Sequence, residues 1–135
     1  MDRPQDVIAQ LVAATNRHDL DALVACFAPD YRLETPAHPS RSFQGHEQVR
    51  RNWEQIFAGV PDIEVETLRI AVDGDVVWSE WEMRGTRRDG ARHLGRGPVI
   101  FGIRDGQIAW GRFYVEPVDE SAITPDQVVR AQVGR

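Results

Sequence analysis

Three stretches in the first half of the chain place apolar residues at helical spacing, which predicts three amphipathic helices. The first begins near Pro4, and its recurring positions are Val7, Ile8, Leu11, Val12 and Thr15. The second follows Asp19, a suitable N-cap, and is expected to end at Pro29-Asp30. The third begins at Gly45, and its apolar face is Val49, Trp53, Ile56 and Phe57. Each helix needs another layer of structure to cover that face.

The second half of the chain alternates apolar and polar residues, which predicts strands. The expected strands are residues 63–70, 76–87, 99–104 and 107–116, and an earlier one is residues 31–35. The turn signals between the later strands are Asp73-Gly74-Asp75, Arg88-Asp89-Gly90 and Asp105-Gly106. Residues 36–44 contain two prolines and two serines, which predicts a loop.

This order of elements predicts an α+β fold in which three N-terminal helices cover one face of a curved, mostly antiparallel sheet. Long strands curl, so the layers are expected to form a cone that encloses a cavity for a small molecule. We expect one domain over residues 1–118. Residues 119–135 are expected to form a tail that is either mobile or carries a short helix from Thr124-Pro125-Asp126.

Composition narrows the classes of function. The chain has 135 residues, 41% hydrophobic and 27% charged, which suits one globular domain. Its net charge of −5 argues against contacts with a phosphate backbone, so we expect no nucleic-acid partner. The N-terminus lacks an apolar signal region and no apolar run approaches transmembrane length, so we expect a cytoplasmic protein with no membrane partner.

The residue types that hold metals and cofactors are sparse or scattered. The single cysteine, Cys26, lies in an apolar run, so we expect a small buried residue and no disulfide. No two histidines have the spacing of metal ligands. The glycines between residues 85 and 97 do not form a phosphate-binding loop. We therefore expect neither a metal nor a cofactor.

Five short motifs occur in order between about residues 5 and 117: NRHDLDAL at 16–23, FAPDY at 27–31, GHEQVR at 45–50, WEMRGT at 81–86 and DGQI at 105–108. Together they resemble the nuclear-transport-factor-2-like superfamily, and within it the SnoaL-like branch, near the polyketide cyclases, steroid isomerases and limonene-epoxide hydrolases. The resemblance implies the cone-shaped fold. It leaves the activity open, because this fold hosts enzymes, carriers and assembly modules.

The resemblance also implies that the catalytic groups of the best-known relatives are missing. Leu11 stands at the position of the steroid isomerases' tyrosine, Thr35 at that of their base, and Val99 near that of their second acid. None of these side chains can do the corresponding task, so enolisation by that mechanism is not expected. The positions that correspond to the hydrolases' arginine and two aspartates carry Trp81, Met83 and Arg112.

Alternation along the middle strand predicts which side chains face the cavity. The more apolar set is Val77, Ser79, Trp81 and Met83, which we expect to meet the helices. Glu80 and Glu82 are then expected to face outwards, as solvated or dimer-facing charges.

The last strand is ambiguous, because both of its faces contain apolar residues. The family layout favours Trp110, Arg112 and Tyr114 inwards, on the same face as Ile108. An inward Arg112 needs Glu116, Glu34 or a bound anion as its partner, and the alternative is a salt bridge near the rim.

Two further groups of residues are candidates for ligand contact. His38 lies in the loop at the expected mouth of the cavity, where it is either a general base near neutral pH or an exposed loop histidine. Several aromatic residues either line a pocket for a flat or polycyclic ligand or simply pack in the core, and they are Trp53, Trp81, Trp110 and Tyr114.

Our first hypothesis is a cofactor-independent enzyme of the cyclase, isomerase, lyase or epoxide-opening type, acting on a small hydrophobic or aromatic molecule. In this hypothesis Arg112 stabilises a developing oxyanion, Tyr114 donates a hydrogen bond or a proton, and His38 or Glu116 is the base. The expected substrate-binding residues are Thr35, Trp53, Trp81, Met83, Trp110 and Val99. The hypothesis fails if Arg112 points outwards. The alternative is a non-catalytic module for small-molecule binding or dimerisation.

A homodimer through the outer face of the sheet is also predicted. Trp78 and Phe113 are expected on that face, where they would otherwise be exposed apolar surface.

Overall fold

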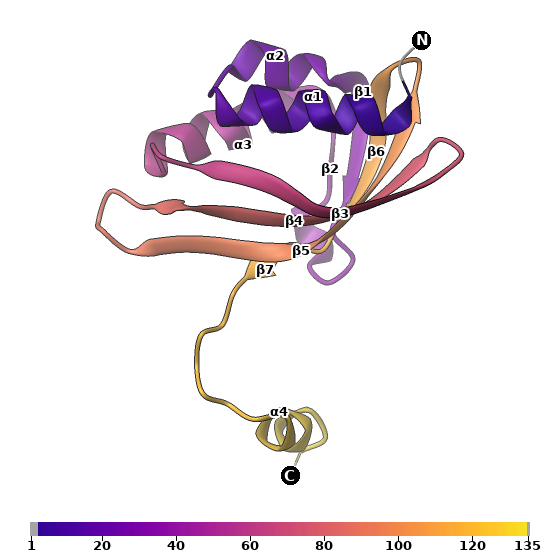
Figure 1. The fold of residues 1–135 in the computed structure, drawn as a ribbon. Coiled ribbons are helices and arrows are strands. Elements are labelled where there is room, and N and C mark those ends of the chain that lie inside the picture. Colours follow the sequence, from indigo (N-terminus) through magenta and orange to yellow (C-terminus); the bar gives the residue numbers. More distant parts are fainter. Residues whose placement is uncertain (1–2, 135) are drawn as a thin grey trace.

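The computed structural model describes residues 3–134, in which the first three α-helices pack on one face of a curved sheet (Figure 1). The helices are α1 (Pro4–Asn16), α2 (Leu20–Ala25), α3 (His46–Gly59) and α4 (Pro125–Gln132), with a short 3-10 turn at Pro39–Arg41. The predicted helix starts are confirmed. Pro4 occupies the first turn of α1, and the Asp19 carboxylate caps α2 by accepting a hydrogen bond from the Ala22 N–H at 3.1 Å.

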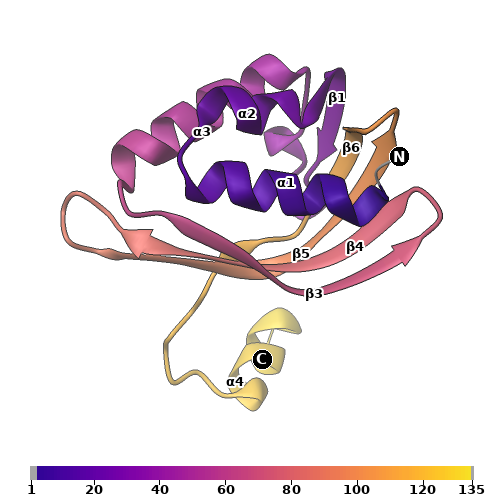
Figure 2. The same ribbon diagram turned by 45° about the horizontal axis from the view of Figure 1, so that its top comes forward.

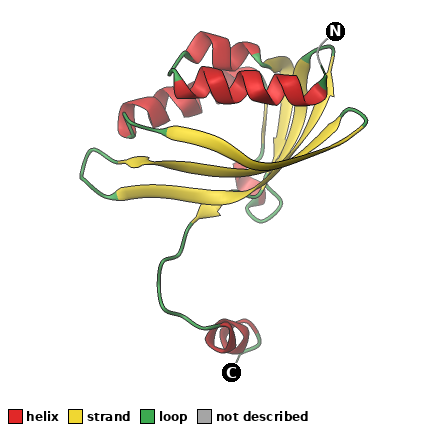
Figure 3. Cartoon of the chain, in the orientation of Figure 1, coloured by secondary structure: helices red, strands yellow, loops and turns green. Residues whose placement is uncertain are grey.

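The described strands form one sheet in the order β2-β1-β6-β5-β4-β3, with the short β7 paired to β5. Their bounds are β1 (Phe27–Glu34), β2 (Phe43–Gln44), β3 (Glu64–Asp73), β4 (Val76–Thr86), β5 (Arg92–Arg104), β6 (Gln107–Phe113) and β7 (Glu116–Pro117). Within this sheet β1 and β6 run parallel and the other pairs are antiparallel. Helices α1 to α3 all lie on the concave face (Figures 2 and 3), so the α+β class with a mostly antiparallel sheet is confirmed.

Two boundaries differ from the prediction. Helix α2 ends at Ala25, before the expected stop at Pro29-Asp30, which lies inside β1. Proline fits there because the pairing of β1 with β6 is interrupted between Phe27 and Arg32, where a strand N–H is not needed. Strand β5 begins at Arg92, well before the expected residue 99, because it pairs along the whole length of β4.

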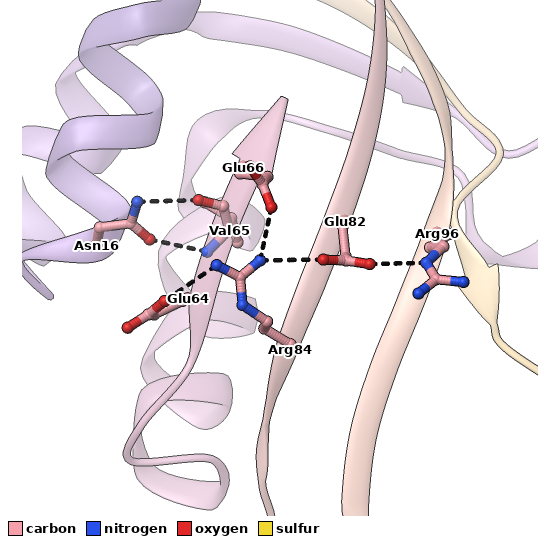
Figure 4. Close-up of polar contacts among 7 residues, drawn as sticks. All are labelled: Asn16, Glu64, Val65, Glu66, Glu82, Arg84 and Arg96. Carbon is pink, nitrogen blue, oxygen red and sulfur yellow. Dashed lines mark hydrogen bonds and ion pairs between the residues drawn. The ribbon is translucent and has the colours of Figure 1, made fainter. Parts of the chain in front are cut away.

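The core lies between the N-terminal helices and the concave face of the sheet. Its fully buried side chains include Ile8, Leu23, Ile63, Val77 and Ile108. The end of α1 is fixed by Asn16, whose amide nitrogen donates to the Val65 carbonyl at 2.9 Å and whose oxygen accepts from the Val65 N–H at 2.8 Å (Figure 4). This pair of bonds satisfies two backbone groups of an edge strand and orients α1 over β3.

Charged residues cluster on the outer face of β3, β4 and β5. The Arg84 guanidinium contacts carboxylates of Glu64, Glu66 and Glu82, and the Arg96 Nε donates to the other oxygen of Glu82 at 2.7 Å (Figure 4). The outward orientation predicted for Glu82 is therefore confirmed. Hydrogen bonding to Arg96, with a further contribution from Arg84, lowers the pKa of Glu82, whose side chain is 16% exposed.

This lowered pKa predicts a pH-dependent contribution to stability. The folded state favours the ionised form of Glu82, so the ion pairs of this carboxylate stabilise the fold. This stabilisation is fully present above the ordinary glutamate pKa of 4.5 and is lost as the pH falls through the lower pKa of the folded state. We expect Glu82→Gln to lower the thermal midpoint at neutral pH, and this difference from wild type to shrink in acid. Glu120→Gln, which removes an exposed partner of Arg92, should change little. A Glu82→Gln deficit that persists unchanged below pH 4.5 would contradict the ion-pair explanation.

The C-terminal segment leaves the sheet after β7, and α4 lies apart from the helical layer, beyond the opposite face of the sheet (Figures 1 and 2). Thr124 caps α4 in a reciprocal pair with Gln127, as the sequence signal indicates. The division of the chain at residue 118 stays a prediction. Among residues 3–134, no helix has the length and apolar character needed to cross a membrane.

Candidate functional site

A cavity of about 270 Å³ lies between the concave face of the sheet and helices α1 and α3. Small-molecule sites commonly occupy about 300–1,000 Å³, so this cavity suits a compact ligand or one end of a longer one. The predicted site residues that line it are Thr35, His38, Trp53, Trp81, Met83, Val99 and Glu116. Further lining residues come from α1, α3 and β1, and they include Leu11, Thr15, Tyr31, Leu33, Val49 and Asn52.

The predicted alternation on β4 is confirmed. Val77, Ser79 and Trp81 are buried beneath the helices, and Trp81 and Met83 reach the cavity. The Trp81 indole N–H donates to Ser79 Oγ at 2.8 Å, and that hydroxyl donates to the Val99 carbonyl at 2.7 Å. Trp81 therefore has its polar group satisfied within the protein and offers the cavity a flat apolar wall.

The predicted orientation of the last strand is wrong. Phe113 and Val115 line the cavity, whereas Trp110, Arg112 and Tyr114 are absent from its lining. The reason is an irregularity in the β5–β6 pairing between Gly102 and Ile103, which breaks the alternation after Ile108. Ile108 consequently points into the core and Trp110 packs against Gly102 on the outer face.

Arg112 is part of a rim salt bridge on the outer face. Its Nη1 lies 2.7 Å from a carboxylate oxygen of Glu34, and its Nη2 lies 3.4 Å from the Tyr114 hydroxyl. This is the alternative considered for it from the sequence. The hypothesis that Arg112 stabilises an oxyanion in the cavity, with Tyr114 as its donor partner, is therefore wrong.

The remaining pair of predicted catalytic residues does meet at the cavity. His38 Nε2 and Glu116 Oε1 are 2.7 Å apart, although the residues are 78 positions apart in the chain. Both side chains line the cavity and both remain partly exposed, which places them at its mouth. A carboxylate only accepts hydrogen bonds, so the bond assigns the ring proton to Nε2 and leaves Nδ1 of a neutral imidazole as an acceptor.

Thr35 positions the histidine. Its hydroxyl donates to the His38 carbonyl at 2.7 Å, and its backbone N–H donates to Ser42 Oγ at 3.0 Å, which closes the loop between β1 and β2. The predicted role of Thr35 in substrate contact stays a prediction. Its hydrogen bonds show that it also orders the loop that carries His38.

Glu116 reaches the mouth because the chain crosses back over β5. Gly97 has a φ of +151°, and a Cβ at this position would clash with the carbonyl oxygen of Tyr114. This close approach lets β7 pair with β5, with Glu116 opposite Arg96. The strand expected to run from 107 to 116 therefore ends at Phe113, and Glu116 lies on a separate short strand.

Residues 3–134 contain neither an activated thiol nor a cluster of metal ligands. Burial raises the pKa of the Cys26 thiol, whose Sγ contacts the Ala22 carbonyl, so Cys26 is a poor nucleophile. No group of three histidine, cysteine, aspartate or glutamate residues in the described chain could hold a metal ion. The cavity residues that correspond to the steroid isomerases' working positions, Leu11, Thr35 and Val99, do line the cavity but carry no acid or base.

A model of the SnoaL-like domain matches residues 8–110 of the chain. The chain belongs to the SnoaL-like domain family. This assignment agrees with the element order, the curved sheet and the enclosed cavity described above. A search of curated proteins by sequence finds no match.

Solved structures share the architecture of this SnoaL-like domain. IdmH from Streptomyces antibioticus, proposed to be a polyketide cyclase, is 23% identical over 99% of this chain and all of its own, with a TM-score of 0.74. A loop-truncated IdmH variant is 26% identical over 84% of this chain and 93% of its own, with a TM-score of 0.71. A ketosteroid isomerase-like protein from Catenulispora acidiphila, solved with trimethylamine, is 19% identical over 80% and 84% of the two chains, with a TM-score of 0.69.

Proposed function

We propose that this SnoaL-like domain is a cofactor-independent enzyme that moves a proton on a compact hydrophobic molecule bound in the cavity. The observation that carries the proposal is the 2.7 Å contact between His38 and Glu116 at the cavity mouth. A carboxylate that accepts a hydrogen bond from one ring nitrogen of a histidine orients the ring, so that the other nitrogen can act as a general base. Likeness to a proposed polyketide cyclase supports the same class of chemistry.

In the proposed step, His38 Nδ1 removes a proton from the carbon next to a carbonyl group of the ligand. The C–H electron pair forms the carbon–carbon double bond of an enolate, and the carbonyl electrons move to oxygen, which carries the negative charge. Glu116 stabilises the imidazolium that forms, and the proton returns from Nδ1 to carbon. Cyclisation, isomerisation and elimination next to a carbonyl all begin with this proton removal.

Proton exchange tests the proposal without knowledge of the natural substrate. The compact bicyclic ketone 1-tetralone is incubated in D₂O with the protein, and NMR follows the replacement of its α-protons by deuterium. We expect exchange above the buffer rate, in proportion to protein concentration. Saturable binding of 1-tetralone with exchange only at the buffer rate would favour the alternative, a non-catalytic binding module. The cavity lining also offers that alternative some support, because Leu11 and Val99 carry no acidic group.

We also propose that the outer face of the sheet pairs with a second copy of the chain. Trp78 is 52% exposed there and Trp110 is 37% exposed, whereas Phe113, expected on this face, lines the cavity instead. Charges of both signs flank the two tryptophans, as the Arg69–Glu80 and Arg112–Glu34 pairs. Such a surface is self-complementary about a twofold axis, where arginines can oppose carboxylates.

Light scattering tests this dimer. We expect wild type to be dimeric and Trp78→Glu to be monomeric, because a buried unpaired carboxylate at the centre of the interface is costly. Gln55→Glu, on the exposed side of α3 in the helical layer, is the control and should leave the dimer intact. A wild type that stays monomeric at every concentration, or a Gln55→Glu variant that alone dissociates, would overturn the proposed face.

A further inference from the structure

Tyr31 is a buried tyrosine of the cavity wall that the proton-transfer step does not use. It lies on the concave side of β1 and is only 3% exposed. Its ring packs edge-on against Phe27, with centroids 4.7 Å apart, and against Phe43, with centroids 6.0 Å apart. Two aromatic neighbours therefore fix the direction in which the hydroxyl points.

The hydroxyl occupies the space that a side chain at position 111 would fill. A Cβ added to Gly111 would lie 2.7 Å from the Tyr31 oxygen, so only glycine leaves room for it. Gly111 pairs with Phe101, and Phe101 lines the cavity, so this space belongs to the inner side of the sheet. The Tyr31 oxygen is thus held inside the concave layer, away from the half-exposed pair at the mouth.

This hydroxyl makes no hydrogen bond with any residue between 3 and 134, in contrast to the two threonine hydroxyls and the Trp81 indole of the lining. Thr15 Oγ1 donates to the Leu11 carbonyl at 2.7 Å, and Thr35 and Trp81 have the partners described above. Because the Tyr31 residue is only 3% exposed, solvent has little access to the hydroxyl, and a ligand in the cavity that accepts from it would gain a hydrogen bond. Burial also raises the pKa of Tyr31, which keeps the group protonated and able to donate.

We propose that the Tyr31 hydroxyl determines which ligands the cavity accepts, by donating a hydrogen bond to a carbonyl oxygen that enters the interior. The ligand class is then a compact, uncharged, mostly apolar molecule with one carbonyl group at its leading end. This inference rests on the proposed function only in taking the cavity as the substrate site. It does not depend on His38 as the base.

Paired probes and paired variants test this role. The probes are 1-tetralone and tetralin, which share a carbon skeleton but differ in the carbonyl group, and binding is measured by NMR titration. Tyr31→Phe removes one hydroxyl and keeps the ring, whereas Tyr114→Phe removes the hydroxyl of the other tyrosine, outside the cavity. We expect Tyr31→Phe to weaken binding of the ketone by about two- to tenfold, the worth of one neutral hydrogen bond, and to leave tetralin unchanged. Tyr114→Phe should change neither.

Two further readouts separate ligand recognition from a structural role. The infrared C=O stretch of bound 1-tetralone should shift to higher wavenumber in Tyr31→Phe, because the hydrogen bond that lowers it is lost. The thermal midpoint of the unliganded variant should not fall, because the hydroxyl has no partner to lose. The inference would be overturned if Tyr31→Phe left both the ketone affinity and the C=O stretch of the bound ketone unchanged. It would also be overturned if the thermal midpoint of unliganded Tyr31→Phe fell, or if the ketone showed no saturable binding to wild type.

The outcome is distinguishable from that of the proposed enzyme. His38→Gln should greatly slow deuterium exchange while keeping the ketone affinity and the lowered C=O stretch of the bound ketone. If Tyr31→Phe leaves binding unchanged but exchange still depends on His38, the inference fails and the proposed function stands. If Tyr31→Phe lowers ketone binding but no exchange occurs in wild type, the inference stands and the proposed function fails.

Discussion

Replacing His38 with glutamine is expected to slow the exchange of 1-tetralone α-protons by about 10²–10⁴-fold, the usual contribution of a positioned base. Glutamine preserves the size and the hydrogen bond to Glu116 but cannot accept a proton. Binding of the ketone should change little, so the loss should appear in the rate at saturation and not in the affinity. NMR measurement of deuterium incorporation, over a range of ketone concentrations, separates the two quantities.

Two companion variants define the site further. Glu116→Gln should give a smaller loss than His38→Gln, because the base remains but its protonated form loses the carboxylate 2.7 Å away. His46→Gln is the matched control, since His46 opens α3 and is not among the lining residues. Equal exchange rates for wild type and His38→Gln would rule out His38 as the base.

Replacing Trp81 with alanine is expected to lower the free energy of unfolding by about 3–5 kcal/mol, the largest stability effect predicted for this domain. Trp81 is 3% exposed and packs edge-on against Phe101, with ring centroids 6.1 Å apart. Its removal also takes away the hydrogen bond that Ser79 Oγ accepts and leaves a void that joins the cavity. Urea unfolding followed by circular dichroism measures the change.

A conservative change at the same position provides the control. Trp81→Phe keeps an aromatic wall and loses mainly the hydrogen bond to Ser79, so its effect should be smaller. Added indole should raise the thermal midpoint of Trp81→Ala more than that of wild type, because an apolar void binds an apolar molecule of matching shape. Equal stabilities of Trp81→Ala and wild type would contradict the packing described here.

The fold could be predicted because its determinants are local. The spacing of residues such as Val7, Ile8 and Leu11 reports a helix face directly, and the Asp105-Gly106 turn fixes the β5–β6 hairpin. The same alternation placed Trp81 and Met83 at the cavity correctly, because β4 pairs without interruption with β5. This uninterrupted pairing makes the two faces of β4 readable from sequence, although the β3–β4 pairing on its other side shifts between Thr67 and Arg69.

The parts of the site that were not predictable depend on irregular pairing and distant contacts. The interruption near Gly102 and Ile103 has no clear sequence signal, and it turned Trp110 and Arg112 outwards. The contact of His38 with Glu116 depends on a loop closed by Thr35 and on the approach of the chain to Gly97. Tyr31 shared the predicted strand of Thr35, and its alternation with that residue was the signal that could have placed it in the cavity.

The cavity is tested most directly by locating a bound ketone in solution. With ¹³C-methyl-labelled protein, NOEs between bound 1-tetralone and the protein identify the residues in contact. We predict NOEs to the methyl groups of Leu11 and Val99, which line the cavity from α1 and β5. NOEs to the exposed valines Val128 and Val129 of α4, with none to Leu11 or Val99, would contradict the cavity as the binding site.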